Sequence, residues 1–272
     1  MSRPSFQSSI DPKNSYWLIG VMIASKMLAY IVVLVLLWQS IVSLFDVAPY
    51  LVPPPLEVGR SLVELPNYYF KHTAVTFTES ALGILVGFFA GLLLGVVMHY
   101  GGLVGRLLTP LVVASQVFPK ESLAPLFLVI FGFGIFPKVL ISALICFFPV
   151  AINTQQGLAS TPDAYLRLMH VSGASSFQCF WHCVLPFSLK YIAASGRVCA
   201  VLGLIGAVVG EFVGASAGLG HVIRASYADI STERVFASLI LLGTIGGLFY
   251  GIAAFADSVL LRRFETKRYL GA

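Results

Sequence analysis

The sequence has few charged residues and many apolar ones. Of its 272 residues, only 11% are charged and 58% are hydrophobic. A water-soluble domain of this length needs far more polar side chains to cover its surface. The composition therefore excludes an ordinary soluble globular protein and predicts an integral membrane protein.

The motifs of several enzyme classes are absent as well. The sequence contains no Gly-x-x-x-x-Gly-Lys-Ser/Thr phosphate-binding loop, no His-Glu-x-x-His and no Gly-x-Ser-x-Gly. A membrane-embedded enzyme is expected to have a cluster of His, Asp or Glu at one depth in the membrane, and the sequence shows none. We therefore expect no enzymatic activity and no cofactor in this chain, so any energy for transport must come from elsewhere.

Cysteine is scarce, and its placement indicates neither disulfides nor a metal site. Cys146, Cys179, Cys183 and Cys199 lie in apolar segments or in the polar stretch at 161–186. Cys179, His182 and Cys183 lack the fourth ligand that a structural zinc site requires. The formal charge of +5 is spread over both ends and several loops, which does not indicate a nucleic-acid-binding surface.

Several apolar segments are long enough to cross a membrane, which takes about 20 residues of helix. The candidate spans are 27–45, 81–105, 107–133, 139–157, 187–214 and 235–256. The 107–133 segment is interrupted by Pro119, Lys120, Glu121 and Pro125. The sequence thus predicts an all-α polytopic membrane protein with about six transmembrane helices.

One membrane domain at 27–261 accounts for these spans, with no linker long enough to separate two domains. A cytoplasmic or interfacial segment at 1–26 precedes it, and a basic tail at 262–272 follows it. The segment 48–71 contains five prolines, which exclude a continuous helix and predict an ordered connection.

The positions of Lys and Arg predict the orientation, because short loops rich in these residues stay in the cytoplasm. With the N-terminus inside, the inner segments hold ten Lys and Arg residues and the outer segments five, Lys138 among them. Both termini and the loop at 158–186 are then cytoplasmic. The connections at 46–71, 134–138 and 215–234 face outward.

Four glycines in the 81–105 segment are spaced four residues apart, at Gly83, Gly87, Gly91 and Gly95. This spacing places them on one helix face. Small residues on one face allow two transmembrane helices to approach closely. We expect this face to pack against another helix.

The stretch 161–186 is amphipathic, in contrast to the segments around it. Thr161 is predicted to cap a helix with Pro162 at its first position and Asp163 in its first turn. Gly173 permits a turn, so two short amphipathic helices are expected. Periodicity alone favours equally a docking element for a partner protein and a pair of helices lying on the lipid surface.

Gly173-Ala174, followed by Leu185-Pro186, resembles the signature loop of the inner-membrane permease subunits of ABC importers. The segments 117–134, 209–215 and 218–220 are similar to the branch that imports sulfonates, taurine, nitrate and thiamine-pyrimidine precursors. The family loop usually opens with Glu-Ala-Ala. Here those positions hold Arg167, Leu168 and Met169, and Asp163 lies one helical turn earlier.

The resemblance implies a type I importer permease in the bacterial inner membrane, with a coupling helix that inserts into a groove on a cytoplasmic ATPase. That ATPase would bind ATP and Mg²⁺, a binding protein would deliver the solute from outside, and a second permease copy would complete a homodimer. The residues assigned to ATPase coupling on this basis are Asp163, Tyr165, Leu166, Arg167, Met169, Gly173, Ala174, Phe177, Leu185 and Pro186.

Charged residues inside spans are the candidates for the translocation pathway, because a bare ion in hydrocarbon is costly and faces protein or water. The candidate pathway and gate residues are the charged Lys120, Glu121, Arg197 and Glu211, together with the uncharged Pro119, Pro125 and Phe131. Arg197 and Glu211 are fourteen residues apart, about 21 Å along a helix, so they do not pair with each other. For Lys120 and Glu121 the alternative is a self-neutralising structural pair or a position nearer the interface, and for Arg197 and Glu211 a structural brace is the favoured interpretation.

The predicted function is therefore the permease subunit of an ATP-driven importer for a small solute. The resemblance leaves open a sulfonate, a nitrate- or bicarbonate-like anion, or a heteroaromatic thiamine precursor. The alternative is a stand-alone secondary transporter driven by an ion gradient. Such a carrier is expected to have paired inverted repeats with interrupted helices in both halves, and only one half of this sequence contains an interruption.

Overall fold

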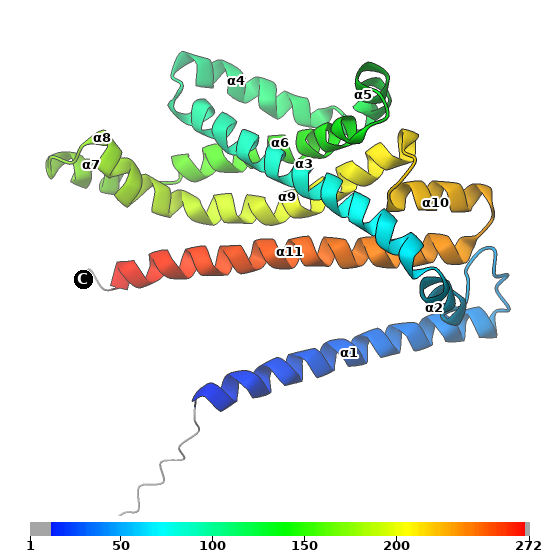
Figure 1. The fold of residues 1–272 in the computed structure, drawn as a ribbon. Helices are drawn as coiled ribbons and strands as arrows, with labels where there is room; N and C mark the ends of the chain where they lie inside the picture. Colours follow the sequence, from blue (N-terminus) through cyan, green and yellow to red (C-terminus); the bar gives the residue numbers. More distant parts are fainter. Residues whose placement is uncertain (1–11, 270–272) are drawn as a thin grey trace, which may run out of the picture.

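The structure is a computed structural model that describes residues 12–269, with the side chains of residues 22, 25, 26 and 29–261. Helices are its only regular secondary structure within that range (Figure 1). They are α1 (Pro12–Leu44), α2 (Pro55–Glu64), α3 (Pro66–Tyr100), α4 (Leu103–Ala114), α5 (Ala124–Phe131), α6 (Ile135–Ala159), α7 (Asp163–Val171), α8 (Ser176–Cys179), α9 (Leu185–Gly214), α10 (Leu219–Ala228) and α11 (Thr232–Tyr269). Short turns of 3₁₀-helix (η1, Ser115–Val117; η2, Lys120–Leu123) and of π-helix (η3, Phe180–Val184) join some of them.

Helices α3, α6 and α9 form the centre of the bundle. All four glycines of the predicted face on α3 are buried against α6. A Cβ atom at Gly91 would lie 2.7 Å from the carbonyl oxygen of Phe147, and one at Gly95 would lie 2.6 Å from that of Ala151. Both distances are shorter than van der Waals contact, so the predicted close helix packing is confirmed.

A second face of small residues, on α9, also packs against α6. Gly203, Gly206 and Gly210 bring the α9 backbone close to Ser142 and Lys138. The Ser142 hydroxyl donates a hydrogen bond of 2.7 Å to the carbonyl oxygen of Gly203. Helix α6 is therefore in close contact with two glycine-bearing helices, and its backbone has little room to shift.

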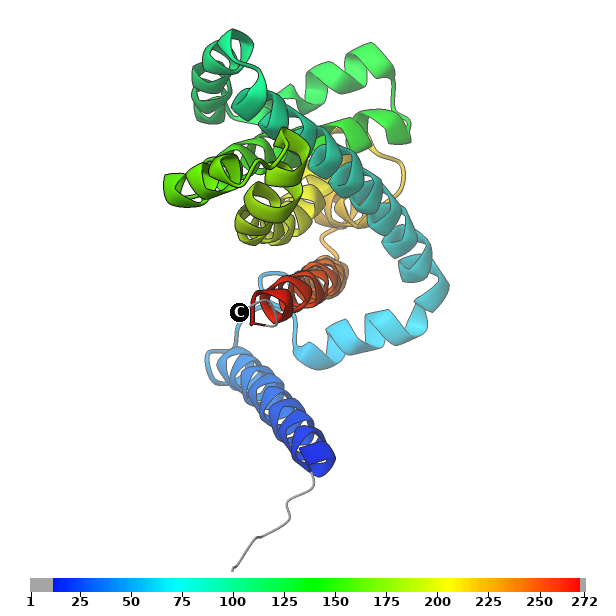
Figure 2. The ribbon, with the colours of Figure 1, turned by 90° about the vertical axis from the view of Figure 1, so that its left-hand side faces the viewer.

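The proline-rich connection after α1 is ordered, as predicted. It contains the short helix α2, which packs on α10 and α11 through Val58, Tyr69, Val222 and Ala237. Figure 1 shows α2 and α10 together at one end of the bundle, with α7 and α8 at the opposite end. Figure 2, turned by 90°, shows α1 lying outside the main bundle, where Trp38 stacks on Phe236 of α11 with ring centroids 5.4 Å apart.

Four helices of the described chain are long and apolar enough to cross a membrane, and five if one bent pair is counted as a span. The bent pair, Leu103–Val117 and Lys120–Phe131, turns by 86° at the predicted interruption. The described apolar part of α1, Ala29–Leu44, is shorter than such a span. These five segments and α1 correspond to the six predicted spans, although α1 is helical from Pro12 onward and α11 continues to Tyr269.

Candidate functional site

Helix α7 begins one residue later than the sequence suggests. Pro162 is its N-cap, with an extended ψ of 137°, and no side chain caps the helix.

 Pro162 therefore lies between Thr161 and the first helical residue, Asp163. Because that proline separates it from the helix, Thr161 does not cap α7, and its buried hydroxyl has no partner among the described residues. Asp163 does lie in the first turn, as predicted.

Helix α7 is exposed along its whole length. None of its residues is buried, although Tyr165, Leu168 and Val171 are large apolar or aromatic residues with 46%, 63% and 88% of their surface exposed. Leu166 and Met169 are half-buried, and Arg167 is exposed. An amphipathic helix that leaves large apolar side chains uncovered is typical of a surface that binds a partner or lipid.

Gly173 and Ala174 end α7 in a Schellman motif. The N–H of Gly173 donates to the carbonyl oxygen of His170, and the N–H of Ala174 donates to that of Met169, both at 3.0 Å. Gly173 has φ of +73°, which favours glycine. The turn predicted at Gly173 is thus confirmed, and it places Met169, Gly173 and Ala174 in one hydrogen-bonded unit.

The second helix of the segment starts with a capping box. Ser175 Oγ accepts from the N–H of Gln178 at 3.3 Å, and Gln178 Oε1 accepts from the N–H of Ser175 at 2.9 Å. The pattern Ser-x-x-Gln was present in the sequence as a signal for this start. Phe177 follows it and is 70% exposed.

A π-helical turn, η3, joins α8 to α9. The N–H of Leu185 donates to the carbonyl oxygen of Phe180, five residues earlier. Pro186 has no N–H to continue the α-helical pattern at this point, which accounts for the local widening. Leu185 and Pro186 are therefore the first two residues of α9, and the segment 161–186 runs into this long helix without a loop.

An aromatic contact links α7 directly to α9. The rings of Tyr165 and Phe187 lie 5.2 Å apart between centroids. A displacement of α7 therefore has two routes into α9, through this contact and through η3.

The bend between α4 and α5 brings together Pro119, Lys120, Glu121 and Pro125. Lys120 Nζ lies 4.9 Å from the centre of the Phe148 ring. Glu121 is exposed, and neither residue belongs to the two ion pairs recorded within the described chain. The interpretation of Lys120 and Glu121 as a self-neutralising pair is thus not supported.

Phe131 ends α5 and lies in an aromatic group. Its ring contacts those of Phe127 and Phe136, with centroids 6.1 and 5.2 Å apart. Because 47% of its surface is exposed, Phe131 remains available for contacts outside this chain.

Arg197 and Glu211 do not pair with each other, as predicted. Arg197 forms an ion pair with Asp257 of α11, whose side chain is buried. Asp257 was not predicted as a partner, because it lies one residue beyond the predicted span 235–256; the apolar helix continues to Leu261 and buries it. This ion pair fixes α11 beside α9.

Glu211 is fully buried where α9 ends and α10 begins. Its Oε1 accepts from the Thr76 hydroxyl and its Oε2 from the N–H of Gly220, both at 2.6 Å. Gly218, with φ of +109°, passes so close to the carboxyl group that a Cβ atom there would overlap it. The motif Gly218-Leu-Gly220 thus surrounds Glu211 with backbone.

Glu79 and Lys138 form a buried ion pair beside Glu211, with Nζ of Lys138 2.5 Å from Oε1 of Glu79. Lys138 was predicted to lie in the connection 134–138, and this is wrong. It is a buried residue of α6, and its ammonium group is paired inside the bundle. Charged residues in apolar segments were the signal for this cluster, and Glu79 was not recognised as a site residue.

The cysteines are all free, and three of them are buried. Cys146 Sγ donates to the carbonyl oxygen of Cys199 at 3.2 Å, which ties α6 to α9. Within residues 12–269, no group of His, Cys, Asp or Glu has the arrangement of a metal site.

Comparison with known proteins identifies the class. Residues 83–265 match the family of binding-protein-dependent transport system inner membrane components, and the chain belongs to this family. The fold agrees: the chain resembles a solved chain from inward-facing conformations of the MetNI methionine ABC transporter, with a TM-score of 0.59 and 18% identity over 71% of this chain and 94% of that chain.

Two curated relatives give a finer comparison. The chain is 34% identical to a probable ABC transporter permease protein of Haemophilus influenzae, over 88% of this chain and 96% of the relative. It is 32% identical to the formylaminopyrimidine transport permease protein ThiX of Halalkalibacterium halodurans, over 85% of this chain and 93% of that protein. The chain is a multi-pass membrane permease of an ABC importer, and the secondary transporter is not favoured.

Proposed function

We propose that this permease is driven by a separate cytoplasmic ATPase, which binds ATP and Mg²⁺ and receives α7 in a groove. The exposed apolar face of α7 is the observation that carries this proposal. The face includes Tyr165, whose ring also contacts Phe187 of α9. A movement of the ATPase would reach the membrane helices through this contact and through the continuous η3–α9 connection.

Asp163 takes part in this docking as the acidic residue at the start of the helix. It lies in the first turn of α7 and is exposed. A carboxylate at this position interacts favourably with the helix dipole and is free to contact a basic group of the ATPase. Asp163 therefore replaces the acidic residue that is usual in the family loop.

The proposed orientation has α7, α8 and both termini in the cytoplasm of a bacterial cell, with the helices in its inner membrane. The beginning of α1 and the end of α11 both point toward the end of the bundle that carries α7 and α8 (Figure 1). The excess of Lys and Arg in the predicted inner segments supports the same orientation. Because Lys138 is buried in α6, it no longer counts among the Lys and Arg residues of the outer segments, and the excess on the inner side is larger.

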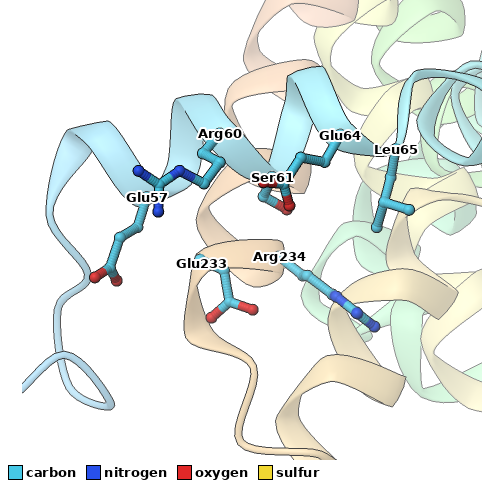
Figure 3. A pocket seen from close by; sticks show the side chains of 7 residues that line it. All are labelled: Glu57, Arg60, Ser61, Glu64, Leu65, Glu233 and Arg234. Atoms are coloured by element: carbon cyan, nitrogen blue, oxygen red, sulfur yellow. The ribbon is translucent and has the colours of Figure 1, made fainter.

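The opposite end, with α2 and α10, is proposed to receive the binding protein. An open pocket of about 270 Å³ lies there between α2 and the start of α11. Figure 3 shows Glu57 and Arg60 on α2 near Glu233 and Arg234 on α11. Charges of both signs at the rim suit a transient polar contact with a soluble protein.

Two copies of the chain are proposed to enclose the pathway. In one copy the arm formed by α4 and α5 leaves Val129 and Ile130 exposed by 82% and 60%. Lys120, Glu121 and Phe131 lie on or beside this arm. A second copy facing this arm would bring both sets of candidate pathway residues to a shared interface.

The proposed substrate is a small heteroaromatic compound of the formylaminopyrimidine type. The relative that carries this name shares 32% identity across nearly its whole length. Its name is the support for this choice over the sulfonates and anions that the resemblance also allows.

Uptake by a strain that lacks this permease tests the substrate. Restoring the gene is expected to restore ATP-dependent accumulation of radiolabelled formylaminopyrimidine, and excess unlabelled taurine or nitrate should not compete. Competition by taurine or nitrate, or no gene-dependent uptake of formylaminopyrimidine, would contradict the substrate proposal. Uptake that persists when ATP is depleted but the ion gradient is maintained would contradict the proposal that an ATPase drives the transport.

A further inference from the structure

Three ionisable residues meet inside the bundle, far from α7. Glu79 of α3, Lys138 of α6 and Glu211 of α9 have 1%, 5% and 0% of their surface exposed, and we call them the buried triad. Two carboxylates and one ammonium group would leave one uncompensated negative charge. An unpaired buried charge is costly in a protein interior.

The hydrogen bonds around Glu211 fix its role as an acceptor. The Thr76 hydroxyl accepts from the N–H of Leu219 at 2.7 Å and donates to Oε1 of Glu211 at 2.6 Å. The N–H of Gly220 donates to Oε2 at 2.6 Å. Both oxygens of Glu211 therefore receive hydrogen bonds, which is the pattern of an ionised carboxylate.

Glu79 differs from Glu211 in this respect. Its Oε1 accepts from Lys138, while its buried Oε2 has no donor among the described residues. Thr76, which donates to Glu211, lies three residues before Glu79 on the same face of α3, so Glu79 faces the part of the bundle that holds Glu211. Two ionised carboxylates buried with a single ammonium group repel each other, so the cluster is favourable only when one of them holds a proton.

The surrounding groups supply no second positive charge within the described chain. His72 accepts a 3.0 Å hydrogen bond at Nδ1 from the N–H of Gly218, so its ring is neutral. His221 lies beyond His72, with ring centroids 5.9 Å apart. Arg224 is exposed and donates to the carbonyl oxygen of Ala215, and Lys71 is exposed on α3.

We propose that Glu79 and Glu211 form a proton-binding site, in which one proton on Oε2 of Glu79 is donated to Glu211. The triad then contains one ammonium group, one carboxylate and one carboxylic acid, and it is electrically neutral. Every oxygen of the two carboxyl groups has a hydrogen-bonding partner. The bound proton joins α3 to α9 and, through Gly220, to α10.

Glutamine substitutions distinguish the two carboxyl groups. In Glu79→Gln the amide oxygen can accept from Lys138 and the amide N–H₂ can donate to Glu211, so the variant mimics the protonated acid. In Glu211→Gln the amide N–H₂ would face the donors Thr76 or Gly220. We therefore expect Glu79→Gln to retain the Tm of the full-length permease and Glu211→Gln to lower it by roughly 5 °C or more.

Infrared spectroscopy detects the proton itself. The purified wild-type chain in lipid nanodiscs is expected to show the C=O stretch of a protonated carboxyl group, and Glu79→Gln should abolish it. Asp229→Asn, which alters an exposed acidic residue, should leave that band and the Tm unchanged.

The absence of a protonated-carboxyl band in the wild type, or its persistence in Glu79→Gln, would overturn the proposal. A low Tm for Glu79→Gln together with a normal Tm for Glu211→Gln would place the proton on Glu211 and contradict the assignment to Glu79. The wild-type spectrum tests the proposal even if a variant does not fold.

Discussion

Replacing Gly173 with valine is expected to reduce ATP-driven uptake strongly while the permease stays folded in the membrane. Gly173 has φ of +73° and no neighbouring atom within 4 Å of the position of a Cβ atom. Valine is β-branched and would adopt this conformation only with strain of about 1–2 kcal/mol. The Schellman motif would then open, and the face of α7 would be misplaced on the ATPase.

The expected loss of uptake is at least about tenfold, since 1.4 kcal/mol corresponds to a factor of ten in an equilibrium constant. The measurement is initial uptake in cells, normalised to the amount of permease in the membrane. Gly102→Val is the matched control, because Gly102 also has a positive φ, +56°, and open space around it, but lies between α3 and α4. Equal losses in the two variants, or normal uptake in Gly173→Val, would contradict the role of α7.

Replacing Gly218 with alanine is expected to destabilise the folded permease strongly. A Cβ atom at this position would overlap the carboxyl group of Glu211, and φ of +109° is unfavourable for alanine. Glu211 is fully buried and has its hydrogen-bonding partners around it, so it has no room to move aside. The expected cost is about 3 kcal/mol or more, which lowers the Tm by about 6 °C or more.

Gly243→Ala provides the control for this variant. Gly243 lies inside α11, and no atom lies within 4 Å of its Cβ position. Alanine there should leave the Tm unchanged or raise it, because alanine favours helix by about 1 kcal/mol over glycine. A Gly218→Ala protein with the wild-type Tm in the same detergent would show that Glu211 does not require the glycine.

The sequence was sufficient to predict features that depend on neighbouring residues. The glycines of α3 are repeated every four residues, and this spacing predicted the face that packs on α6. Gly173 predicted the end of α7, because only a few conformations end a helix there. The interruption at Pro119 similarly predicted the bend of 86° between α4 and α5.

Features that depend on distant residues were not predicted. Lys138 and Glu79 are 59 residues apart, and nothing in the spacing of either indicates the other as its partner. The positive charge of Lys138 therefore suggested a loop, whereas pairing with Glu79 allows it to be buried. Likewise, Asp257 became a recognisable partner of Arg197 only once α11 was seen to lie beside α9.

Site-specific photo-cross-linking from α7 tests the central claim most directly. A photoreactive amino acid at Leu168, which is 63% exposed on α7, is expected to cross-link in cells to an ABC ATPase, with a yield that changes when ATP is depleted. The same probe at Leu56 of α2, at the other end of the bundle, should not reach that ATPase. Cross-linking of the Leu168 probe to lipid alone, or to an ATPase from Leu56 instead, would contradict the account.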